Sequence, residues 1–390
     1  MLTFQVIGEV VGVVSLAAWI YLVFGRGGFW RMRELPAPKL TGGAKSIAVV
    51  IPARNEEAVV GQAIGSLLQQ DYPGPLRVFL VDDHSTDRTI ASAGSHQRLT
   101  IVKARPLPDG WTGKLWAISE GLEQAAVEPD YILLTDADIV HAPDNIAGLV
   151  ARAEAGNLDL VSYMVKLQCR TLAERALIPA FVFFFFKLYP PAWIARRDRK
   201  TAGAAGGCML IRRSALERMG GIATIRGDLI DDCALARAVK RSGGAIWLGL
   251  TRETRSIRDY TNFGEIRNMI ARTAFTQLRY STGLLIGTIL AMAIIYLAPP
   301  LLLLTGDPIT AGCGAAAWSL MSISYLPTLR LYGLSIAWAP LLPRVALFYM
   351  VATVDSALRY WTGRGGEWKG RVQVGRTPRP RRSPWSGSAN

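Results

Sequence analysis

Two acidic side chains, Asp136 and Asp138, follow the uncharged segment 131–135 and are separated by one alanine. Side chains two positions apart in an extended chain point to the same side, so both carboxylates can face one ligand. Carboxylate oxygens are ligands that Mg²⁺ and Mn²⁺ prefer, and these cations also bind substrate phosphates. The pair therefore predicts a divalent-metal site, and a solvated loop is the simpler alternative.

A second acidic pair, Asp82 and Asp83, ends the segment 76–83. Two adjacent carboxylates at the end of a buried strand are unfavourable without polar partners. The base N–H groups or ribose hydroxyls of a nucleotide would be such partners. This pair therefore predicts a nucleotide-binding position.

A third acidic pair, Asp231 and Asp232, lies at the start of the amphipathic segment 227–240. The helix dipole favours carboxylates at the N-terminal end of a helix, and this effect alone is the simpler explanation. A carboxylate held there can also act as a general base that takes a proton from an acceptor hydroxyl.

The segments around these acids predict the fold that positions them. Segments 46–52, 76–83 and 131–138 are short and mostly apolar, whereas segment 55–70 has helical periodicity. Strands that alternate with helices indicate an α/β fold with a parallel sheet, and ligands bind beyond the carboxyl ends of its strands. We therefore expect the strand-end acids to face a common crevice.

The composition excludes some partners and leaves others. The chain has 390 residues, half of them hydrophobic, and a net charge of +14. A basic balance suits nucleic acid, an anionic membrane surface or an anionic substrate. No zinc-finger spacing, RNP-type motif or basic helix indicates nucleic acid. The four cysteines are scattered, so they predict neither disulfides nor a zinc site and suit a reducing compartment.

An apolar segment near the N-terminus predicts a membrane anchor. Residues 4–24 are nearly free of charge and are followed by Arg26, Arg31 and Arg33. Because no cleavage site of the usual kind follows, we expect residues 1–28 to form a retained transmembrane anchor. Basic residues mark the cytoplasmic side, so we expect the N-terminus to lie outside and the part after the anchor to lie in the cytoplasm.

Further membrane segments are expected in residues 281–356. Segments 282–304 and 309–329 carry no charge and predict a transmembrane hairpin. Segment 331–354 is interrupted by two prolines and an arginine, so we expect a broken, re-entrant or interfacial segment. The basic tail 357–390 then lies in the cytoplasm, and a third crossing that places it outside is the alternative.

An aromatic segment interrupts the part that resembles an enzyme. Residues 176–200 contain four consecutive phenylalanines and end in a basic cluster. An apolar helix with a cationic end lies in the membrane interface, so we expect this segment to dock the site onto the bilayer and admit a lipid hydroxyl. A buried core helix is the alternative, and three prolines argue against one long regular helix. The side chains expected to contact the membrane or the acceptor are Phe183, Phe184, Phe185 and Trp193.

The order of several motifs resembles a known family. The motifs IPARNEE, VDDHSTD, TDAD and IDDCALARAVKRSGG resemble those of family 2 glycosyltransferases of GT-A fold, over residues 46–280. The stretches GWTGKLWA, AAGGCMLIRR, MIARTAFTQLRYS and WTGRGGEWKGR resemble the hopene-associated glycosyltransferases, which are similar to the ceramide glucosyltransferase group. The resemblance implies a Rossmann-like parallel or mixed sheet, a nucleotide-diphosphate sugar donor and inversion at the sugar.

The resemblance also implies which residues bind the donor. Asp136 and Asp138 would hold sugar and diphosphate through a divalent metal, with Asp138 as the direct ligand. For Lys114, which would meet the donor phosphates, a solvated lysine at a helix start is the simpler alternative. The remaining implied positions around the nucleotide are Pro52, Asn55, Glu57, Asp82 and Asp83.

For the transfer itself, the resemblance implies Asp232 as the catalytic base, with Asp231 beside it. Gly206 and Gly207 would let the backbone approach the acceptor. Relatives carry Q/R-x-x-R-W after the base, and this chain departs from that motif because Thr273 stands where tryptophan is expected. A cationic residue there would stabilise the leaving diphosphate, and a basic interfacial helix is the simpler explanation. The candidates are Arg272, with Gln277 and Arg279 as alternatives.

These inferences predict a multi-pass protein of the bacterial-type cytoplasmic (inner) membrane. We expect an inverting hexosyltransferase that uses Mg²⁺ or Mn²⁺ and moves a sugar from a UDP-sugar to a lipid hydroxyl, with a hopanoid as the candidate acceptor. A polyprenyl-phosphate glycosyltransferase or a polysaccharide synthase is the alternative enzyme. A non-catalytic, nucleotide-binding membrane scaffold is the alternative of another class.

Overall fold

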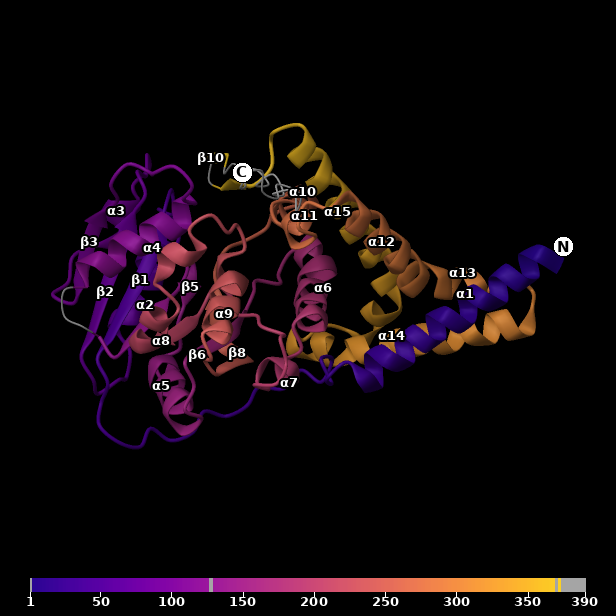
Figure 1. The fold of residues 1–390 in the computed structure, drawn as a ribbon, viewed down its shortest axis with the longest axis horizontal. Coiled ribbons are helices and arrows are strands. Elements are labelled where there is room, and N and C mark those ends of the chain that lie inside the picture. Colours follow the sequence, from indigo (N-terminus) through magenta and orange to yellow (C-terminus); the bar gives the residue numbers. More distant parts are fainter. Residues whose placement is uncertain (1, 126–128, 369–370, 373–390) are drawn as a thin grey trace, which may run out of the picture.

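One eight-stranded mixed sheet forms the core of the α/β part of the molecule (Figure 1). The computed structural model describes residues 2–125, 129–368 and 371–372. The strand order is β3-β2-β1-β4-β7-β6-β8-β5. The parallel pairs are β1–β2, β2–β3, β1–β4 and β6–β8. The antiparallel pairs are β4–β7, β6–β7 and β5–β8. The strands are β1 Ile47–Ala53, β2 Leu76–Asp82, β3 Leu99–Lys103, β4 Tyr131–Leu134, β5 Ile139–Val140, β6 Leu160–Lys166, β7 Met209–Arg212 and β8 Ile246–Ser256.

Strand β1 shows why this sheet has helices on both faces. All seven of its residues are buried. Successive side chains of a strand point to opposite faces, so Val49 and Ile51 enter one hydrophobic cluster and Val50 enters the other. The helices of this part are α2 Val60–Leu68, α3 Thr89–Ala93, α4 Gly113–Gln124, α5 Asn145–Ala155, α8 Arg213–Arg218, η2 Ile222–Ile225 and α9 Asp231–Arg241.

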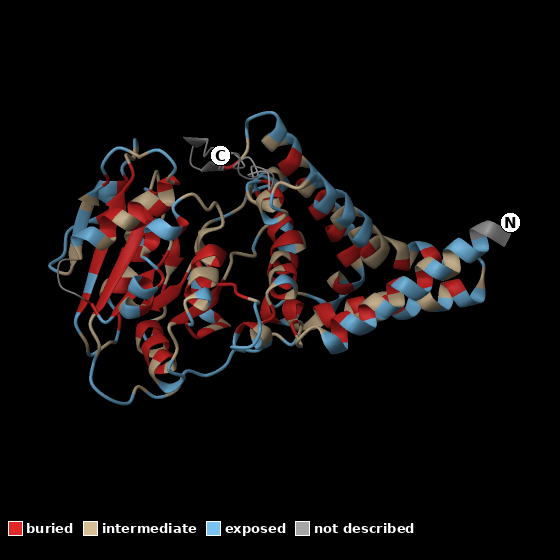
Figure 2. Ribbon diagram, in the orientation of Figure 1, coloured by how far each residue is buried: buried red, intermediate tan, exposed pale blue. Residues whose placement is uncertain are grey.

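A second part of the molecule consists of helices that extend away from the sheet (Figure 1). Large apolar residues of α1 and α12, such as Val6, Val10, Ile286 and Leu290, are exposed, and Figure 2 shows exposed residues along these helices. Such surfaces require an apolar environment. The elements are α1 Leu2–Ile20, η1 Tyr21–Gly25, α6 Leu172–Leu188, α7 Pro191–Ile194, α10 Phe263–Ala271, α11 Ala274–Gln277, α12 Thr282–Met292, η3 Ala293–Leu297, α13 Ala298–Leu302, α14 Pro308–Leu331, η4 Ile336–Leu341 and α15 Leu342–Trp361.

Within the described residues, five helical segments are long and apolar enough to cross a membrane, by length and composition. Three correspond to the anchor and the hairpin predicted from the sequence. The two others were predicted as an interfacial segment and a broken segment. The five are Gln5–Gly25, Leu172–Ile194, Thr282–Leu302, Pro308–Leu331 and Ile336–Trp361.

The last of these segments, expected to be broken, re-entrant or interfacial, contains a long continuous helix. Pro340 lies in the short 3-10 turn η4, and Pro343 occupies the first turn of α15. Proline fits the first helical turn because the N–H that it lacks has no partner there. The prolines therefore start a continuous 20-residue helix and do not interrupt one. Of the basic tail, residues 369–370 and 373–390 lie outside the described residues.

The interpretation of Phe183 and Phe184 as membrane-facing side chains is wrong. Both are buried, Phe183 completely. The Phe183 ring packs against Phe29 and Tyr325 at centroid distances of 5.2 and 5.3 Å. Helix α6 is also continuous over 17 residues with Pro179 inside it. The helices α14 and α15 cover this face of α6, which the local sequence does not reveal.

Trp193 is only partly buried, at the end of the short helix α7. The guanidinium groups of Arg26 and Arg199 lie 4.7 and 5.2 Å from its ring centroid. Trp193 thus links the end of the N-terminal helix to the basic cluster after α7, outside the cavity described next.

Candidate active site

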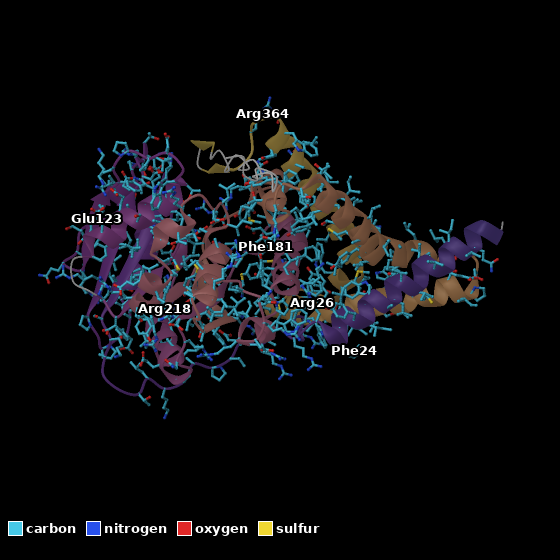
Figure 3. The ribbon with its side chains drawn as sticks, viewed as in Figure 1. Phe24, Arg26, Glu123, Phe181, Arg218 and Arg364 are labelled. Atoms are coloured by element: carbon cyan, nitrogen blue, oxygen red, sulfur yellow. The ribbon has the colours of Figure 1, made fainter. Side chains whose placement is uncertain are left out.

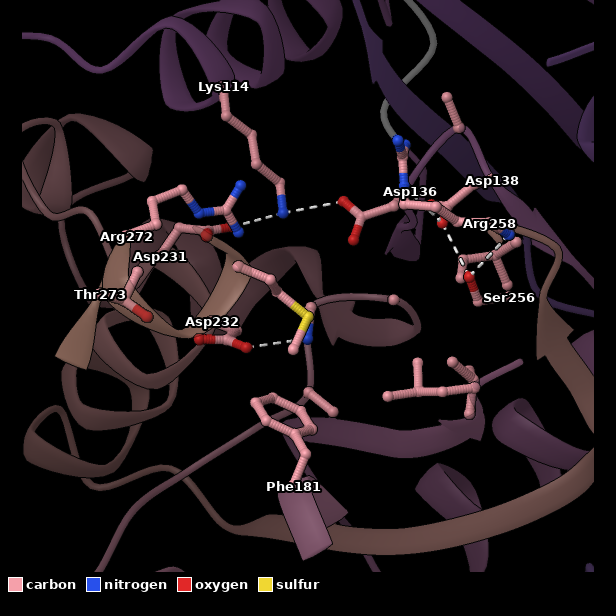
Figure 4. A pocket seen from close by; sticks show the side chains of 18 of the residues that line it. Lys114, Asp136, Asp138, Phe181, Asp231, Asp232, Ser256, Arg258, Arg272 and Thr273 are labelled. Carbon is pink, nitrogen blue, oxygen red and sulfur yellow. Dashed lines mark hydrogen bonds and ion pairs between the residues drawn. The ribbon is translucent and has the colours of Figure 1, made fainter. Parts of the chain in front are cut away.

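A cavity of about 700 Å³ lies between the carboxyl ends of the central strands and the helical part. The strands contribute Pro52 of β1, the residues after β4 and the ends of β6 and β8. The helices α6, α9 and α10 supply the opposite wall. Figure 4 shows charged side chains from several of these elements around one space. The predicted site residues that line it are Pro52, Lys114, Asp136, Asp138, Phe185, Gly206, Gly207, Asp231, Asp232 and Arg272.

Lys114 joins two of the predicted acidic pairs. Its Nζ lies 2.8 Å from Asp136 Oδ1 and 3.0 Å from Asp231 Oδ2 (Figure 4). Thr112 accepts a hydrogen bond from the Leu115 N–H and so caps α4. This cap fixes where α4 begins and thereby places Lys114 in its first turn. Burial alone would lower the pKa of Lys114, but the surrounding carboxylates raise it overall. Lys114 is therefore a charged group at the centre of the cavity.

Asp232 lies in the first turn of α9, across the cavity from Asp136. Its Oδ2 accepts a hydrogen bond of 2.9 Å from the Gly206 N–H. Burial and, next, the charge of Asp231 raise the pKa of Asp232 to about 6, although Lys114 opposes this shift. A carboxylate with a pKa near neutral is suited to accept and release a proton.

Asp138 is held by residues that the sequence analysis did not identify. Its Oδ2 accepts hydrogen bonds from Ser256 Oγ at 2.8 Å and from Arg258 Nε at 3.2 Å. The same guanidinium donates to both oxygens of Glu56, at 2.7 and 2.9 Å. Glu56 belongs to the IPARNEE motif, but the resemblance implies its neighbour Glu57, and it is Glu56 that lines the cavity. Ser256 is the last residue of β8 and Arg258 lies two residues after it, in a stretch that matches none of the motifs in the sequence analysis.

The donor set around Asp136 and Asp138 fits a divalent cation that also binds a phosphate. The described residues contain no group of three or more His, Cys, Asp and Glu side chains that could hold a metal ion. A cation here would thus rely on the two carboxylates and on substrate oxygens. Mg²⁺ is commonly bound in this way, by one or two carboxylates and substrate phosphates.

Four predicted nucleotide-binding residues do not line the cavity. Asn55 Oδ1 accepts from the Thr86 N–H at 2.8 Å, and Asp82 Oδ1 accepts from the Ser85 N–H at 3.1 Å. These bonds connect and shape the loops after β1 and β2. The four residues are Asn55, Glu57, Asp82 and Asp83.

The three candidates for the cationic residue after the base differ in position. Arg272 lines the cavity at the C-terminal end of α10 (Figure 4). Gln277 instead donates from Nε2 to Tyr189 Oη at 2.7 Å, and Arg279 lies in the turn after α11 with a φ of 54°. Gln277 and Arg279 are not among the lining residues, so the geometry favours Arg272.

Comparison with known proteins relates part of the chain to glycosyltransferases. Residues 48–220 match the family described as "Glycosyl transferase family 2". A relative from Staphylococcus aureus (strain bovine RF122 / ET3-1), "4,4'-diaponeurosporenoate glycosyltransferase", is 37% identical over 112 residues, which are 28% of this chain and 28% of that protein. "Probable glycosyltransferase YdaM" from Bacillus subtilis (strain 168) is 28% identical over 248 residues, 55% of this chain and 54% of that protein. The chain thus spans between about a quarter and about half of these relatives.

The fold is similar to that of a solved mannosyltransferase. This structure, "Mannosyltransferase PcManGT from Pyrobaculum calidifontis in complex with GDP-Man and Mn2+", aligns with a TM-score of 0.58 and 19% identity. The alignment covers 90% of this chain and 99% of that one. Together with the mixed sheet, it confirms the predicted GT-A fold.

Proposed function

We propose, on the premise that residues 48–220 form a glycosyltransferase family 2 domain, that this chain is a membrane-bound inverting hexosyltransferase. Its donor would be a nucleotide-diphosphate sugar, with a UDP-sugar expected, and its acceptor a lipid hydroxyl. The observation that carries the proposal is the bridge from Asp136 through Lys114 to Asp231, with Asp232 on the same cavity. This arrangement offers a cation for phosphates beside a base for a hydroxyl.

The donor side of the cavity would bind the diphosphate. Lys114 can donate to phosphate oxygens in place of its present carboxylate partners, and Arg272 lies on the opposite wall. Asp136 and Asp138 would hold a divalent cation. When bound, this cation would offset the charge that develops on the leaving nucleoside diphosphate. The solved mannosyltransferase, whose structure is a complex with GDP-Man and Mn²⁺, supports this class of donor and metal.

Asp232 would be the base of the transfer step. It takes the proton of the acceptor hydroxyl while the acceptor oxygen forms a bond to the anomeric carbon. The bond from that carbon to the diphosphate oxygen breaks, and its electron pair leaves with the diphosphate. Attack from the face opposite the leaving group inverts the sugar. The Gly206 N–H holds Asp232 Oδ2 in place during this step.

The apolar helices support a lipid acceptor and a membrane location. Five helical segments of the described chain have the length and composition to span a bilayer. We propose a bacterial-type cytoplasmic membrane with the catalytic part in the cytoplasm, because Arg26, Arg31 and Arg33 follow the first of these segments. A hopanoid remains the candidate acceptor.

A transfer assay tests the proposal. Purified protein with Mn²⁺ or Mg²⁺ would be incubated with UDP- and GDP-sugars and with lipid extracts that contain hopanoids and carboxylated lipids, and mass spectrometry would identify products. We expect a lipid that gains one hexose mass, and loss of that product in Asp232→Asn with nucleotide binding retained. A water-soluble polymer would instead favour a polysaccharide synthase. Nucleotide binding without any product would favour the scaffold.

A further inference from the structure

Helix α6 presents its phenylalanines in two directions. Phe181 and Phe185 are one helical turn apart, so they share a face, and both line the cavity. Phe183, Phe184 and Phe186 are buried against other helices. Figure 3 places Phe181 between the sheet and the helical part.

The face with Phe181 and Phe185 forms part of an apolar wall beside the base. Figure 4 shows the Phe181 side chain projecting from α6 toward the side of the cavity that holds Asp232. Met164 and Leu167, from the end of β6, and Met269, from α10, line the same cavity. The carboxylates of Asp136 and Asp138, together with the Lys114 ammonium, occupy the donor side. The cavity is therefore charged where a diphosphate would lie and carries an apolar strip where an acceptor would approach, with the polar side chains of Gln168, Glu265 and Asn268 also in its lining.

We propose that Phe181, Phe185 and Met269 form an acceptor subsite that takes an alcohol whose carbons next to the hydroxyl are apolar. This inference rests on the proposed function and specifies its acceptor. A sugar acceptor brings several further hydroxyls that must be hydrogen-bonded when they leave water. Aromatic and thioether side chains cannot form the hydrogen bonds that these hydroxyls need. The same side chains pack well against hydrocarbon. The same wall excludes water from Asp232, which limits hydrolysis of the donor.

Photolabelling tests the subsite independently of turnover. The probe is a straight-chain hexadecanol that carries a diazirine on a carbon near its hydroxyl, applied to the full-length protein in detergent micelles. We expect labelled peptides that contain residues 181–185 and Met269, with labelling reduced by excess hexadecanol and not by glucose. The Phe181→Ala and Phe185→Ala variants should each reduce labelling about tenfold, the scale of a lost hydrophobic pocket contact.

The control variant is Phe183→Ala, on the same helix but buried away from the cavity. It should lower the melting temperature and leave the labelled positions unchanged. Nucleotide binding is measured on every variant to show that the site is folded. Labelling that falls only outside the cavity, or that Phe181→Ala and Phe185→Ala leave unchanged, would overturn the subsite.

Kinetics then separate the two hypotheses. For the acceptor found in the transfer assay, Phe181→Ala should raise the acceptor KM about tenfold with the donor KM unchanged. Sugar transfer that is insensitive to both phenylalanine variants would overturn the subsite alone. Cavity labelling without any transfer that depends on Asp232 would overturn the proposed function and leave an apolar-alcohol site.

Discussion

Arg258 connects Asp138 to Glu56, two buried carboxylates from loops after different strands. Its Nε lies 3.2 Å from Asp138, and its terminal nitrogen lies 2.7 and 2.9 Å from the two Glu56 oxygens. The three side chains form a fixed group in which one positive charge lies between two negative ones. Asp138 is thereby oriented before any ligand enters the cavity, as is common for residues that support metal ligands.

The Arg258→Gln variant should bind Mn²⁺ more weakly. Loss of a group that orients a metal ligand commonly reduces metal affinity about 10- to 100-fold. Titration of Mn²⁺ in the presence of UDP, followed by electron paramagnetic resonance, measures this directly. Arg255→Gln is the matched control, because Arg255 is exposed near the end of β8, three residues before Arg258. Equal Mn²⁺ affinity in the two variants would show that Arg258 does not position Asp138.

The Lys114→Gln variant should lose donor affinity. A hydrogen bond to a charged group contributes about 1.5–3 kcal/mol, so we expect the dissociation constant of the nucleotide sugar to rise roughly 10- to 100-fold. Isothermal titration calorimetry with UDP and UDP-sugars measures the change. Lys103→Gln, at an exposed position of β3, serves as control. An unchanged dissociation constant in Lys114→Gln would place the phosphates elsewhere.

The pH dependence of transfer should report Asp232. Its pKa is raised to about 6 by burial and by Asp231. The protonated form cannot accept a proton, so kcat/KM should fall tenfold per pH unit below about pH 6 and level off above it. Because Lys114 lowers the pKa of Asp232, Lys114→Gln should move this acid limb to higher pH. If kcat/KM falls at the same pH in both proteins, Asp232 is not the group whose protonation limits transfer.

The Gly206→Ala variant should impair transfer without unfolding the protein. An added Cβ would lie 3.4 Å from Lys114 Nζ and 3.5 Å from Asp232 Oδ2, which is ordinary van der Waals contact. The methyl group would therefore fit the fold but occupy space between cation and base. We expect kcat/KM for the acceptor to fall about tenfold, as for a small steric change in a binding pocket. The thermal unfolding of Gly206→Ala should match that of Gly65→Ala, where no atom lies within 4 Å of the added Cβ. Unchanged kcat/KM in Gly206→Ala would argue that the acceptor does not pass beside Gly206.

Much of the site could be predicted because its residues follow local patterns. Asp136 and Asp138 follow the buried strand β4, and Asp231 and Asp232 begin an amphipathic helix. In an α/β fold these positions converge at one edge of the sheet. The strand β2 also ends in acids, Asp82 within it and Asp83 directly after it, but neither lines the cavity. A strand end therefore predicts the edge of the sheet and not the side chain's direction.

The parts that could not be predicted depend on contacts between distant segments. Arg258 reaches Glu56 across 202 positions of sequence and Asp138 across 120. The sequence around Arg258 gives no sign that Glu56 and Asp138 are its partners. Likewise, the burial of Phe183 results from Phe29 and Tyr325, which lie far from it in the chain. Hydrophobicity alone does not distinguish lipid from protein as the environment of a phenylalanine.

Because one face of α6 lines the cavity and the other packs against α14 and α15, the protein cannot simply be divided into fragments. One hydrophobic cluster continues from Val50 of the sheet through Phe183 to Ala346 of α15. The helical part therefore packs against the sheet and stabilises it, in addition to carrying the apolar segments that are long enough to cross a membrane. A fragment cut after residue 280 would leave the aromatic face of α6 uncovered and prone to aggregation. Replacing α14 and α15 with unrelated transmembrane helices would do the same, so modular exchange between such enzymes must carry α6, α14 and α15 as one unit.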